Sequence, residues 1–291
     1  MTPAGTLYLV ATPIGNLEDI TLRALRVLRE AAVIAAEDTR HTRKLLTHHN
    51  IPARLISLHE HNETERIPEL LARLQAGESI ALVSDAGTPG LSDPGTSLIA
   101  AAAAARVPVV PIPGPSALVA ALVSSGLPTA PVTFLGFLPS SPSERRRVLQ
   151  EAGALPHTLV LYEAPHRLRR ALAAMCEVWG DRQVAVAREL TKLHEEVFRG
   201  RLREALEHFS QTPPRGEFTL VVEGASDGDH AAPGPEPAPA QAEDAARAAL
   251  RTALAEGQAP FEAVRRAARA SGLRRNHVYR LWLAIKQEAA R

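Results

Sequence analysis

The first 126 residues alternate short apolar runs with stretches in which apolar residues recur every three or four positions. The short runs predict buried β-strands, and the longer stretches predict helices with one apolar face. We expect Asn16 to cap the first of these helices. The predicted strands are Leu7–Val10, Val33–Ala36, Leu55–Leu58, Ile80–Ser84 and Val107–Ile112. Strands that alternate with helices are typical of a parallel sheet, so residues 1–126 are predicted to form an N-terminal α/β domain.

A second alternating unit occupies residues 127–224. Its predicted strands are Val132–Leu135, Thr158–Tyr162, Val184–Ala187, Glu195–Phe198 and Phe218–Val222. Its predicted helices are Arg145–Glu151, Leu168–Val178 and Leu202–Phe209. The pattern predicts a mixed sheet with helices, and hence a second α/β domain.

The last part of the chain has a different composition. Residues 225–240 are rich in Pro, Gly and Asp and have little apolar bulk to bury, which predicts a flexible linker. Residues 241–291 are rich in Ala and Arg, and their apolar spacing predicts two helices around Gly272. This segment resembles a small helix-turn-helix domain.

Charge is distributed unevenly along the chain. The formal net charge is +1, yet residues 241–291 contain ten Arg or Lys and five Asp or Glu, a balance of +5 that leaves −4 for the rest. A basic end on a mildly acidic body suggests contact with an anionic polymer. The alternative is a solvated helical tail that keeps the protein soluble.

Composition also bounds the class of protein. The single cysteine, Cys176, permits no internal disulfide, and no apolar run is long enough to span a bilayer. The first residues lack a basic leader with a long apolar core. We therefore expect a soluble, cytoplasmic protein.

Gly- and Pro-rich loops follow three of the predicted strands in the first domain. They are residues 12–16, 84–95 and 111–117. Because the carboxyl ends of parallel strands meet at one edge of a sheet, we expect these loops to converge there on a ligand. Each loop taken alone could equally be a rigid connector.

The loops indicate what kind of ligand they hold. They match neither the P-loop pattern nor the G-x-G-x-x-G fingerprint, and they carry little positive charge. They offer backbone groups, the carboxylate of Asp85 and the hydroxyls of Thr88, Ser92 and Ser116. This set suits a cationic or zwitterionic adenosine-type ligand better than a triphosphate. The His59–Glu63 segment matches no zinc spacing, so we expect no metal site.

Six motifs, in order along the chain, resemble the tetrapyrrole methylase superfamily. They are residues 10–17 (VATPIGNL), 85–95 (DAGTPGLSDPG), 113–117 (PGPSA), 162–167 (YEAPHR), 187–192 (ARELTK) and 216–222 (GEFTLVV). The last three resemble in particular the bacterial enzymes that methylate the 2′-oxygen of a cytidine ribose in 16S ribosomal RNA. The resemblance covers about residues 5–224, and the tail is similar to that branch's C-terminal helical domain.

The resemblance implies two α/β domains with S-adenosylmethionine in the cleft between them, plus a small helical C-terminal domain, in a homodimer. It implies a substrate in the decoding region of small-subunit ribosomal RNA, naked or in the 30S subunit. Carried over position by position, the implied cofactor-binding residues are Thr12, Pro13, Asp85, Ala86, Gly87, Thr88, Ser92, Ser116, Ala117, Tyr162, Glu163, Ala164 and Thr219.

Polar residues outside the loops supply candidates for catalysis and RNA binding. Arg188, Glu189 and Lys192 follow one strand end and could orient the ribose hydroxyl or take its proton; the alternative is a surface ion-pair network. The candidate RNA-binding residues are His166, Arg167, Arg265, Arg266, Arg269, Arg274 and Arg275.

The residues alone leave two other functions open. The cofactor loops alone fit a methyltransferase that acts on a tetrapyrrole precursor, a small molecule. A non-catalytic RNA-binding assembly protein that kept the cleft would also carry the basic tail. Turnover of the cofactor distinguishes the second from an enzyme.

Overall fold

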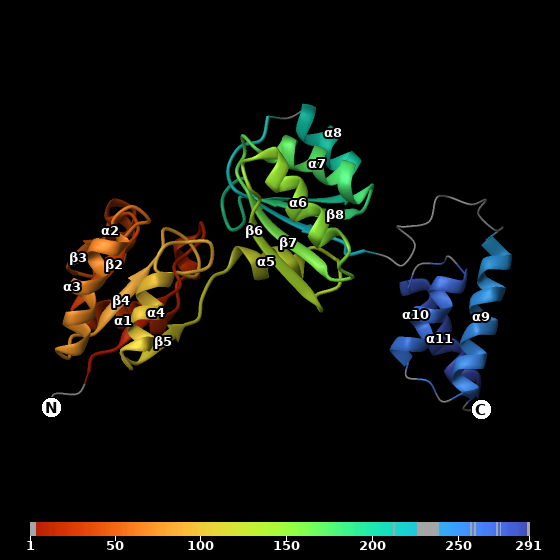
Figure 1. The fold of residues 1–291 in the computed structure, drawn as a ribbon, viewed down its shortest axis with the longest axis horizontal. Coiled ribbons are helices and arrows are strands. Elements are labelled where there is room, and N and C mark those ends of the chain that lie inside the picture. The colour runs from red at the N-terminus through yellow and green to blue at the C-terminus, as the bar shows by residue number, and fades with distance from the viewer. Residues whose placement is uncertain are drawn as a thin grey trace. The chain divides into compact units, whose positions relative to one another are not determined.

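A computed structural model describes residues 4–211, 213–225, 239–256, 260–271 and 275–289, together with Gln258 and Leu273. The chain divides into two compact units, Met1–Gly224 and Ala225–Arg291. The first unit contains two five-stranded sheets, and the described residues of the second form helices and short connections between them (Figure 1).

The first sheet is entirely parallel, with strand order β3-β2-β4-β1-β5. Its strands are β1 (Leu7–Val10), β2 (Val33–Ala36), β3 (Leu55–Ser57), β4 (Ile80–Val83) and β5 (Val109–Ile112). Its helices are α1 (Leu22–Glu30), α2 (Thr39–His48), α3 (Glu63–Gln75) and α4 (Thr96–Ala104). Every residue of β2 and β4 is buried, because helices cover both faces of the sheet.

The first helix starts later than the sequence suggested. The side chain of Asn16 accepts a hydrogen bond from the Glu18 amide, but it closes only a 3₁₀ turn over Leu17–Asp19. Ile20 is extended and buried, so the turn ends there. The hydroxyl of Thr21 then caps α1 by accepting from the Ala24 amide at 3.0 Å. The prediction that Asn16 caps this helix was wrong.

The second sheet is mixed, with strand order β6-β7-β10-β8-β9. Its strands are β6 (Val132–Phe137), β7 (Thr158–Glu163), β8 (Gln183–Arg188), β9 (Glu196–Arg201) and β10 (Phe218–Val222). Only β6 and β7 pair in parallel. Helices α6 (Pro142–Gly153), α7 (Leu168–Trp179) and α8 (Leu202–Gln211) share one apolar core with one face of this sheet.

The other face of the second sheet is covered by α5 (Ala117–Ser124) (Figure 1). Alternate residues of the strands, such as Val160, Ala185 and Val221, pack there against Ala121 and Leu122 of α5. The sequence pattern groups this helix with the first domain, which it predicts to end at residue 126. By its packing, α5 instead belongs with the second sheet, so the chain crosses between the sheets directly after β5.

The C-terminal unit contains α9 (Pro239–Ala255), α10 (Pro260–Ser271) and α11 (Arg275–Ala289). All three share a core that includes Leu250, Ala263, Val278 and Trp282. The sequence predicted two helices here, but α9 adds a third because its apolar positions also recur every three or four residues. Across the described part of the chain, no helix is long and apolar enough to cross a membrane.

Candidate functional site

The loops after β1 and β4 are joined by a short backbone bridge. The Thr12 amide donates to the Gly87 carbonyl at 2.9 Å, and the Gly87 amide donates to the Thr12 carbonyl at 3.0 Å. The Thr12 hydroxyl adds a bond to the Ser84 carbonyl at 3.2 Å. Gly87 has φ +79°, a conformation that favours glycine. The bridge therefore fixes two of the predicted ligand loops against each other.

The loop after β5 lies against the same bridge. A methyl group placed on Gly114 would lie 3.0 Å from the Ala11 side chain, and one on Gly87 would lie 3.9 Å from the Pro115 carbonyl. The Ser116 hydroxyl accepts from the Val119 amide and caps α5, so Pro115 lies just before the helix rather than in its first turn. The three loops meet at one edge of the parallel sheet, as their positions after its strands predicted.

Three carboxylates gather beside these loops. The Asp85 side chain accepts from the Asp38 amide at 3.0 Å, and the Glu37 side chain accepts from the Asp85 amide at 3.3 Å. Burial raises the pKa of Asp93 to about 6; a hydrogen bond with Ser84 opposes the rise, and the charges of Glu37 and Asp85 add to it. Burial also raises the pKa of Glu37. This edge of the sheet is thus poised to attract a cation.

The end of β7 holds a buried carboxylate. Glu163 is 2% exposed; its Oε1 accepts from the Ala164 amide at 3.0 Å and lies 3.2 Å from Nε of Arg167. Its Oε2 is buried and has no hydrogen-bond partner within the described residues. Burial raises the pKa of this carboxyl group, against the charge of Arg167. Arg167 also donates to the Leu138 carbonyl, so its charge is used inside the fold.

The Tyr162 side chain on β7 interacts with both α5 and the β4 loop. Burial raises its pKa, and the hydroxyl interacts with the Leu118 backbone of α5 and with the charge of Asp93. Its ring contacts Phe134 and Phe137, at centroid distances of 5.0 and 5.6 Å. On β10, Thr219 is buried and pairs directly with Tyr162.

A bulge in β6 also meets the β4 loop. The register of β6 shifts between Phe134 and Phe137, and a methyl group placed on Gly136 would lie 3.2 Å from Oγ of Ser92. Bulges often occur beside active sites because they redirect a side chain. Here the bulge leaves the Phe137 side chain half exposed.

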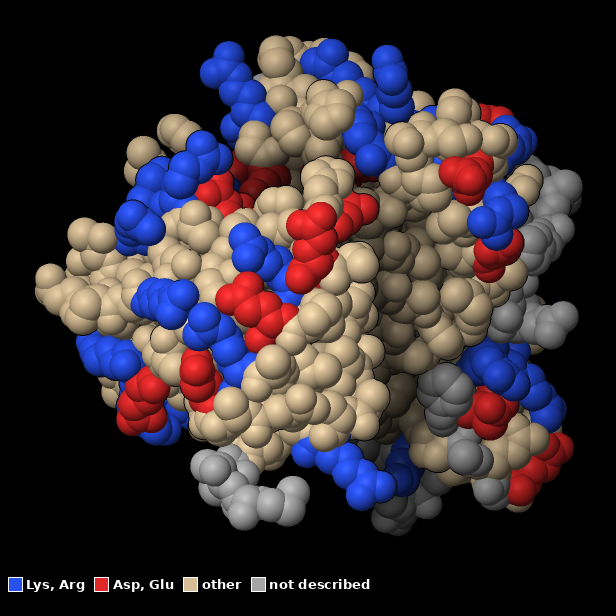
Figure 2. Space-filling view, turned by 60° about the vertical axis from the view of Figure 1, so that its left-hand side comes forward, with Lys and Arg blue, Asp and Glu red and all other residues tan. Residues whose placement is uncertain are grey.

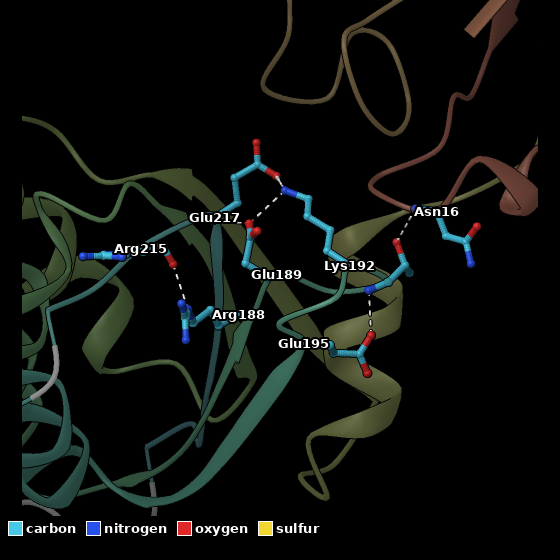
Figure 3. Close-up of polar contacts among 8 residues, drawn as sticks. Asn16, Arg188, Glu189, Lys192, Glu195, Arg215 and Glu217 are labelled. Carbon is cyan, nitrogen blue, oxygen red and sulfur yellow. Dashed lines mark hydrogen bonds and ion pairs between the residues drawn. The ribbon is translucent and has the colours of Figure 1, made fainter. Parts of the chain in front are cut away.

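The loop after β8 packs directly onto the loop after β1 (Figure 3). The Asn16 amide donates to the Thr191 hydroxyl at 3.0 Å. A methyl group on Gly15 would lie 2.4 Å from Cγ of Lys192, so only glycine permits this approach. The ARELTK motif therefore covers one side of the edge that carries the three ligand loops.

Lys192 is held between two carboxylates in this loop. Its Nζ lies 2.8 Å from Oε1 of Glu189 and 3.0 Å from Oε2 of Glu217, as Figure 3 shows. The Glu217 amide also donates to Oε1 of Glu189 at 3.0 Å. Arg188 donates to the Arg215 carbonyl at 2.8 Å and pairs with Glu196 at 3.3 Å. Glu189, Lys192 and Glu217 thus form one hydrogen-bonded network, and Arg188 is held separately at the end of β8.

This network fixes the protonation states of its members. Burial opposes ionisation of Glu189, but hydrogen bonds from Lys192 and the Glu217 amide outweigh it and lower the pKa. Burial likewise opposes the charge on Lys192, but its two carboxylate partners raise its pKa. Glu189 is therefore held as a carboxylate and Lys192 as a cation, so neither is poised to exchange a proton near neutral pH.

Strained backbone marks the same two loops. Five non-glycine residues have positive φ in the described part of the chain, and three of them are Ser92, Glu189 and Thr191, at 65°, 50° and 66°. Such conformations persist only where the surroundings impose them, and they cluster at ligand sites. Ser92 belongs to the β4 loop and the other two to the β8 loop, so both halves of the candidate site are strained.

The candidate RNA-binding residues lie at the end of β7 and in the C-terminal unit. His166 is exposed at the end of β7. Arg265 and Arg266 of α10 are about half exposed and pair with the exposed carboxylates of Glu262 and Glu256. Arg274 and the side chains of Arg269 and Arg275 lie outside the described residues. No group of three His, Cys, Asp or Glu in the described part of the chain is arranged to hold a metal ion.

Sequence reasoning missed several members of the site. Asp93 belongs to a quoted motif but was not singled out, and Glu217 was not linked to Glu189. Glu37 was not linked to Asp85, which it contacts, and Asp38 caps α2. The carboxylates near Glu37 could have been found from their positions after adjacent parallel strands. The contact with Glu217 could not, because it depends on the order of antiparallel strands.

Comparison with known proteins identifies relatives of this chain. A model of the tetrapyrrole (corrin/porphyrin) methylases matches residues 6–206. The chain is 48% identical over 285 residues to ribosomal RNA small subunit methyltransferase I of Synechocystis sp., covering 98% of this chain and 99% of that one. It is 52% identical over 220 residues to the protein of the same name from Halalkalibacterium halodurans, covering 76% of each.

A solved structure shares the fold. Uroporphyrin-III C-methyltransferase from Thermus thermophilus, in complex with S-adenosylhomocysteine, aligns with 75% of this chain and 97% of its own at a TM-score of 0.55 and 21% identity. The expected fold class, two α/β domains of tetrapyrrole methylase type followed by C-terminal helices, is confirmed.

Proposed function

The chain belongs to the tetrapyrrole (corrin/porphyrin) methylase family, and we propose that it transfers a methyl group from S-adenosylmethionine to the 2′-oxygen of a cytidine ribose in the decoding region of 16S ribosomal RNA. The relatives that match almost the whole chain carry the name of a small-subunit ribosomal RNA methyltransferase, which supports the RNA substrate. That similarity extends through the C-terminal helices in the Synechocystis relative, since it covers 98% of this chain.

The residues at the sheet edge fit the cofactor. Its sulfonium and ammonium groups are cationic, and Glu37, Asp85 and Asp93 supply negative charge beside the joined loops. The loops contain no Lys or Arg that would favour a triphosphate. Glu163 supplies a further buried oxygen without a partner among the described residues, available to a donor on a ligand.

The proposed cofactor contacts follow from this fit. Thr12, Pro13 and the 85–88 segment line the joined loops, with Ser92, Ser116 and Ala117 beside them. From the second sheet we assign Tyr162, Glu163, Ala164 and Thr219. The bound cofactor supplies a methyl group activated by its sulfonium.

The β8 loop has a different part in the reaction. Because Glu189 and Lys192 are locked as an ion pair, we propose that they and Arg188 hold the loop in place over the β1 loop and orient the ribose hydroxyl. Orientation alone contributes strongly to a transfer that needs three atoms in line. Donation of a proton by Lys192, or its acceptance by Glu189, is not part of this proposal.

The observation that carries the proposal is the contact between the two halves of the site. The Asn16 amide donates to the Thr191 hydroxyl, which brings the ARELTK motif beside the bridge between Thr12 and Gly87. A substrate held by the ARELTK motif would meet a cofactor held by the joined loops. This arrangement favours an enzyme over an assembly protein that merely binds RNA.

The test uses cells with and without the gene. Nucleosides of small-subunit ribosomal RNA are separated by mass spectrometry, and we expect a 2′-O-methylated cytidine to vanish in the deletion strain. It should return with the wild-type gene and not with an Asp85→Ala variant expressed at the same level. An unchanged nucleoside profile in the deletion strain would refute the proposed function, and accumulation of a tetrapyrrole precursor would favour the small-molecule alternative.

The C-terminal unit is proposed to bind RNA through its arginines. Among the described residues, Arg265 and Arg266 pair only with exposed carboxylates, and such pairs are weak enough to exchange for phosphate. Arg269, Arg274 and Arg275 complete this proposal from sequence. Removing residues 225–291 should weaken RNA binding and reduce its log–log salt slope by roughly 0.7–0.9 for each phosphate that the unit neutralises, with unchanged cofactor affinity. An unchanged slope accompanied by aggregation would identify a solubility tail.

His166 and Arg167 are proposed to act at the end of β7. His166 is exposed and is free to meet RNA. Arg167 is engaged with Glu163 and Leu138, so its proposed role is to hold the end of β7, with any RNA contact secondary. We also propose a cytoplasmic location, which the ribosomal substrate supports, and a homodimer, which the family resemblance implies.

A further inference from the structure

We propose that the exposed face of α2 binds the phosphate backbone of the RNA substrate beside the target nucleotide. This surface consists of Arg40, Arg43, Lys44, Thr47 and His48, and we call it the α2 basic face. The inference rests on the proposed function, because it names a second part of the RNA-binding surface, separate from the C-terminal unit.

The charge pattern around α2 is unusual for this chain. Residues 39–59 contain Arg40, Arg43, Lys44 and Arg54 and no Asp or Glu, whereas the body outside the tail is net acidic. Over the middle of the face drawn in Figure 2, basic and acidic side chains lie interspersed. A run of cations without acids on one short segment is suited to an anionic partner.

The helix directs this charge outward. Thr42, Leu45 and Leu46 are buried against the sheet, so the basic positions, which recur at three- and four-residue spacing, lie on the opposite face. Arg43, Lys44, Thr47 and His48 are exposed. The basic face lines an open hollow of about 640 Å³, together with Thr39.

Most of this charge is available to a ligand. Arg40 lies 2.9 Å from Asp38, which also caps the helix. For Arg43 and Lys44, no ion pair or hydrogen bond of the side chain occurs within the described residues. Most described arginines of the C-terminal unit, by contrast, lie beside a carboxylate, as Arg247 does with Glu243. The α2 cations therefore need not break a pair to bind phosphate.

The α2 basic face is also connected to the cofactor edge. Asp38 caps the start of α2, and its amide donates to the Asp85 side chain at 3.0 Å. A helix of ten residues extends about 15 Å, so its cations lie within that distance of the cap. RNA whose target ribose reaches the loops would pass along this helix, and its phosphates would meet Arg43 and Lys44.

The test compares two double variants of the full chain. Arg43→Ala with Lys44→Ala removes two exposed cations from α2, and Arg23→Ala with Arg26→Ala removes two exposed cations from α1 as the matched control. Binding to a transcript of small-subunit ribosomal RNA and to 30S subunits is measured from about 50 to 200 mM salt, the range over which binding to phosphate weakens steeply. Cofactor affinity, thermal unfolding and mass by light scattering are measured on the same samples.

We expect the α2 variant to bind RNA roughly tenfold more weakly, with a salt slope lower by roughly 0.7–0.9 for each phosphate that the variant no longer neutralises. The control should match the wild type, and both variants should keep wild-type cofactor affinity and melting temperature. Equal affinity and slope in the α2 variant and the wild type would overturn the inference. A change of mass with unchanged RNA binding would also overturn it, by identifying the face as an interface between copies.

The two proposals fail in distinguishable ways. If the wild type methylates ribosomal RNA and the α2 variant binds it equally well, the inference fails and the function stands. If the wild type methylates no ribosomal RNA, the function fails, whatever the binding data show. Weaker binding of the α2 variant, together with slower methylation at limiting RNA and normal rates at saturating RNA, supports both.

Discussion

The two halves of the candidate site are built in different ways. On the first sheet, loops from parallel strands converge, and their carboxylates Glu37, Asp85 and Asp93 remain without a cationic partner among the described residues. On the second sheet, Glu189 is fully engaged with Lys192 and the Glu217 amide. One half keeps charge available to a ligand, whereas the other uses its charges to fix a loop. This difference supports the proposal that the first-sheet loops bind the cofactor together with the end of β7, whereas the β8 loop positions the substrate.

The largest expected effect is a difference in cofactor affinity between a variant of Asp85 and a variant of Glu189. Asp85→Ala should weaken S-adenosylmethionine binding by about 1.5–3 kcal/mol, because a carboxylate that accepts hydrogen bonds from a ligand contributes on that scale. Glu189→Ala should leave cofactor affinity within about twofold of the wild type, because its bonds are internal to the loop. Calorimetry with purified protein in the presence of a chelator measures both.

Asp85→Asn serves as the control, since it keeps the side chain's shape and its bond with the Asp38 amide. It should lose affinity for the cationic cofactor more than for the neutral product S-adenosylhomocysteine. Equal cofactor affinities for Asp85→Ala and Glu189→Ala would show that the division of the site is wrong.

A second substitution introduces strain beside Glu189, in the part of the site that is proposed to position the substrate. Gly216 has φ +81°, and a methyl group there would lie 2.3 Å from the Glu189 carboxylate. Gly216→Ala should cost about 1–3 kcal/mol of stability and slow methyl transfer, because it displaces Glu189. Gly126 has the same φ of +81° and nothing within 4 Å of the added methyl, so Gly126→Ala bears the backbone cost alone. If the two variants methylate RNA at equal rates, Glu189 has no positioning role.

The stability of the protein should depend on pH through Asp93. Because the folded pKa of Asp93 is raised to about 6, above its ordinary 3.8, the folded state favours the protonated carboxyl group. Its contribution to stability is present at low pH and is lost as pH rises from about 4 through 6. Asp93→Asn, which cannot ionise, should therefore gain stability relative to the wild type over this window. Melting curves from pH 4 to 8 measure it, and parallel profiles for the two proteins would contradict it.

The smallest effect distinguishes the two carboxylate partners of Lys192. The Glu217 side chain is 75% exposed, whereas that of Glu189 is 19% exposed. Exposed ion pairs contribute at most about 1 kcal/mol, so Glu217→Gln should change stability and activity little. Glu189→Gln should reduce both more. Unfolding in urea measures the stability of the two variants, and methylation rates measure their activity. A larger loss in Glu217→Gln than in Glu189→Gln would show that Glu217 is the more important partner of Lys192.

The sequence predicted the first half of the site better than the second. Strands β1 and β2 begin and end as predicted, and the parallel order brings the Thr12 and Gly87 loops together without further information. The contact between Asn16 and Thr191 spans 175 positions, and the contact between Glu189 and Glu217 depends on β10 lying beside β8. Neither hydrophobic pattern nor motif specifies which antiparallel strands pair.

The helices show the same limit. The apolar residues of α5 give no sign of which sheet they cover, so the pattern groups the helix with the strands that precede it. The start of α1 depends on two adjacent caps, Asn16 and Thr21, and the first closes only a short turn. Local chemistry allows either residue to cap a helix, but packing of Ile20 decides between them.

The position of the transferred methyl group tests the central claim most directly. Purified protein, S-adenosylmethionine labelled in the methyl group and small-subunit ribosomal RNA are incubated together, and the product is hydrolysed in alkali. A methyl group on the ribose 2′-oxygen blocks cleavage of the adjacent phosphodiester, so we predict that the label remains in an alkali-resistant dinucleotide that begins with cytidine. Label recovered only in mononucleotides would place the methyl group on a base and contradict the account.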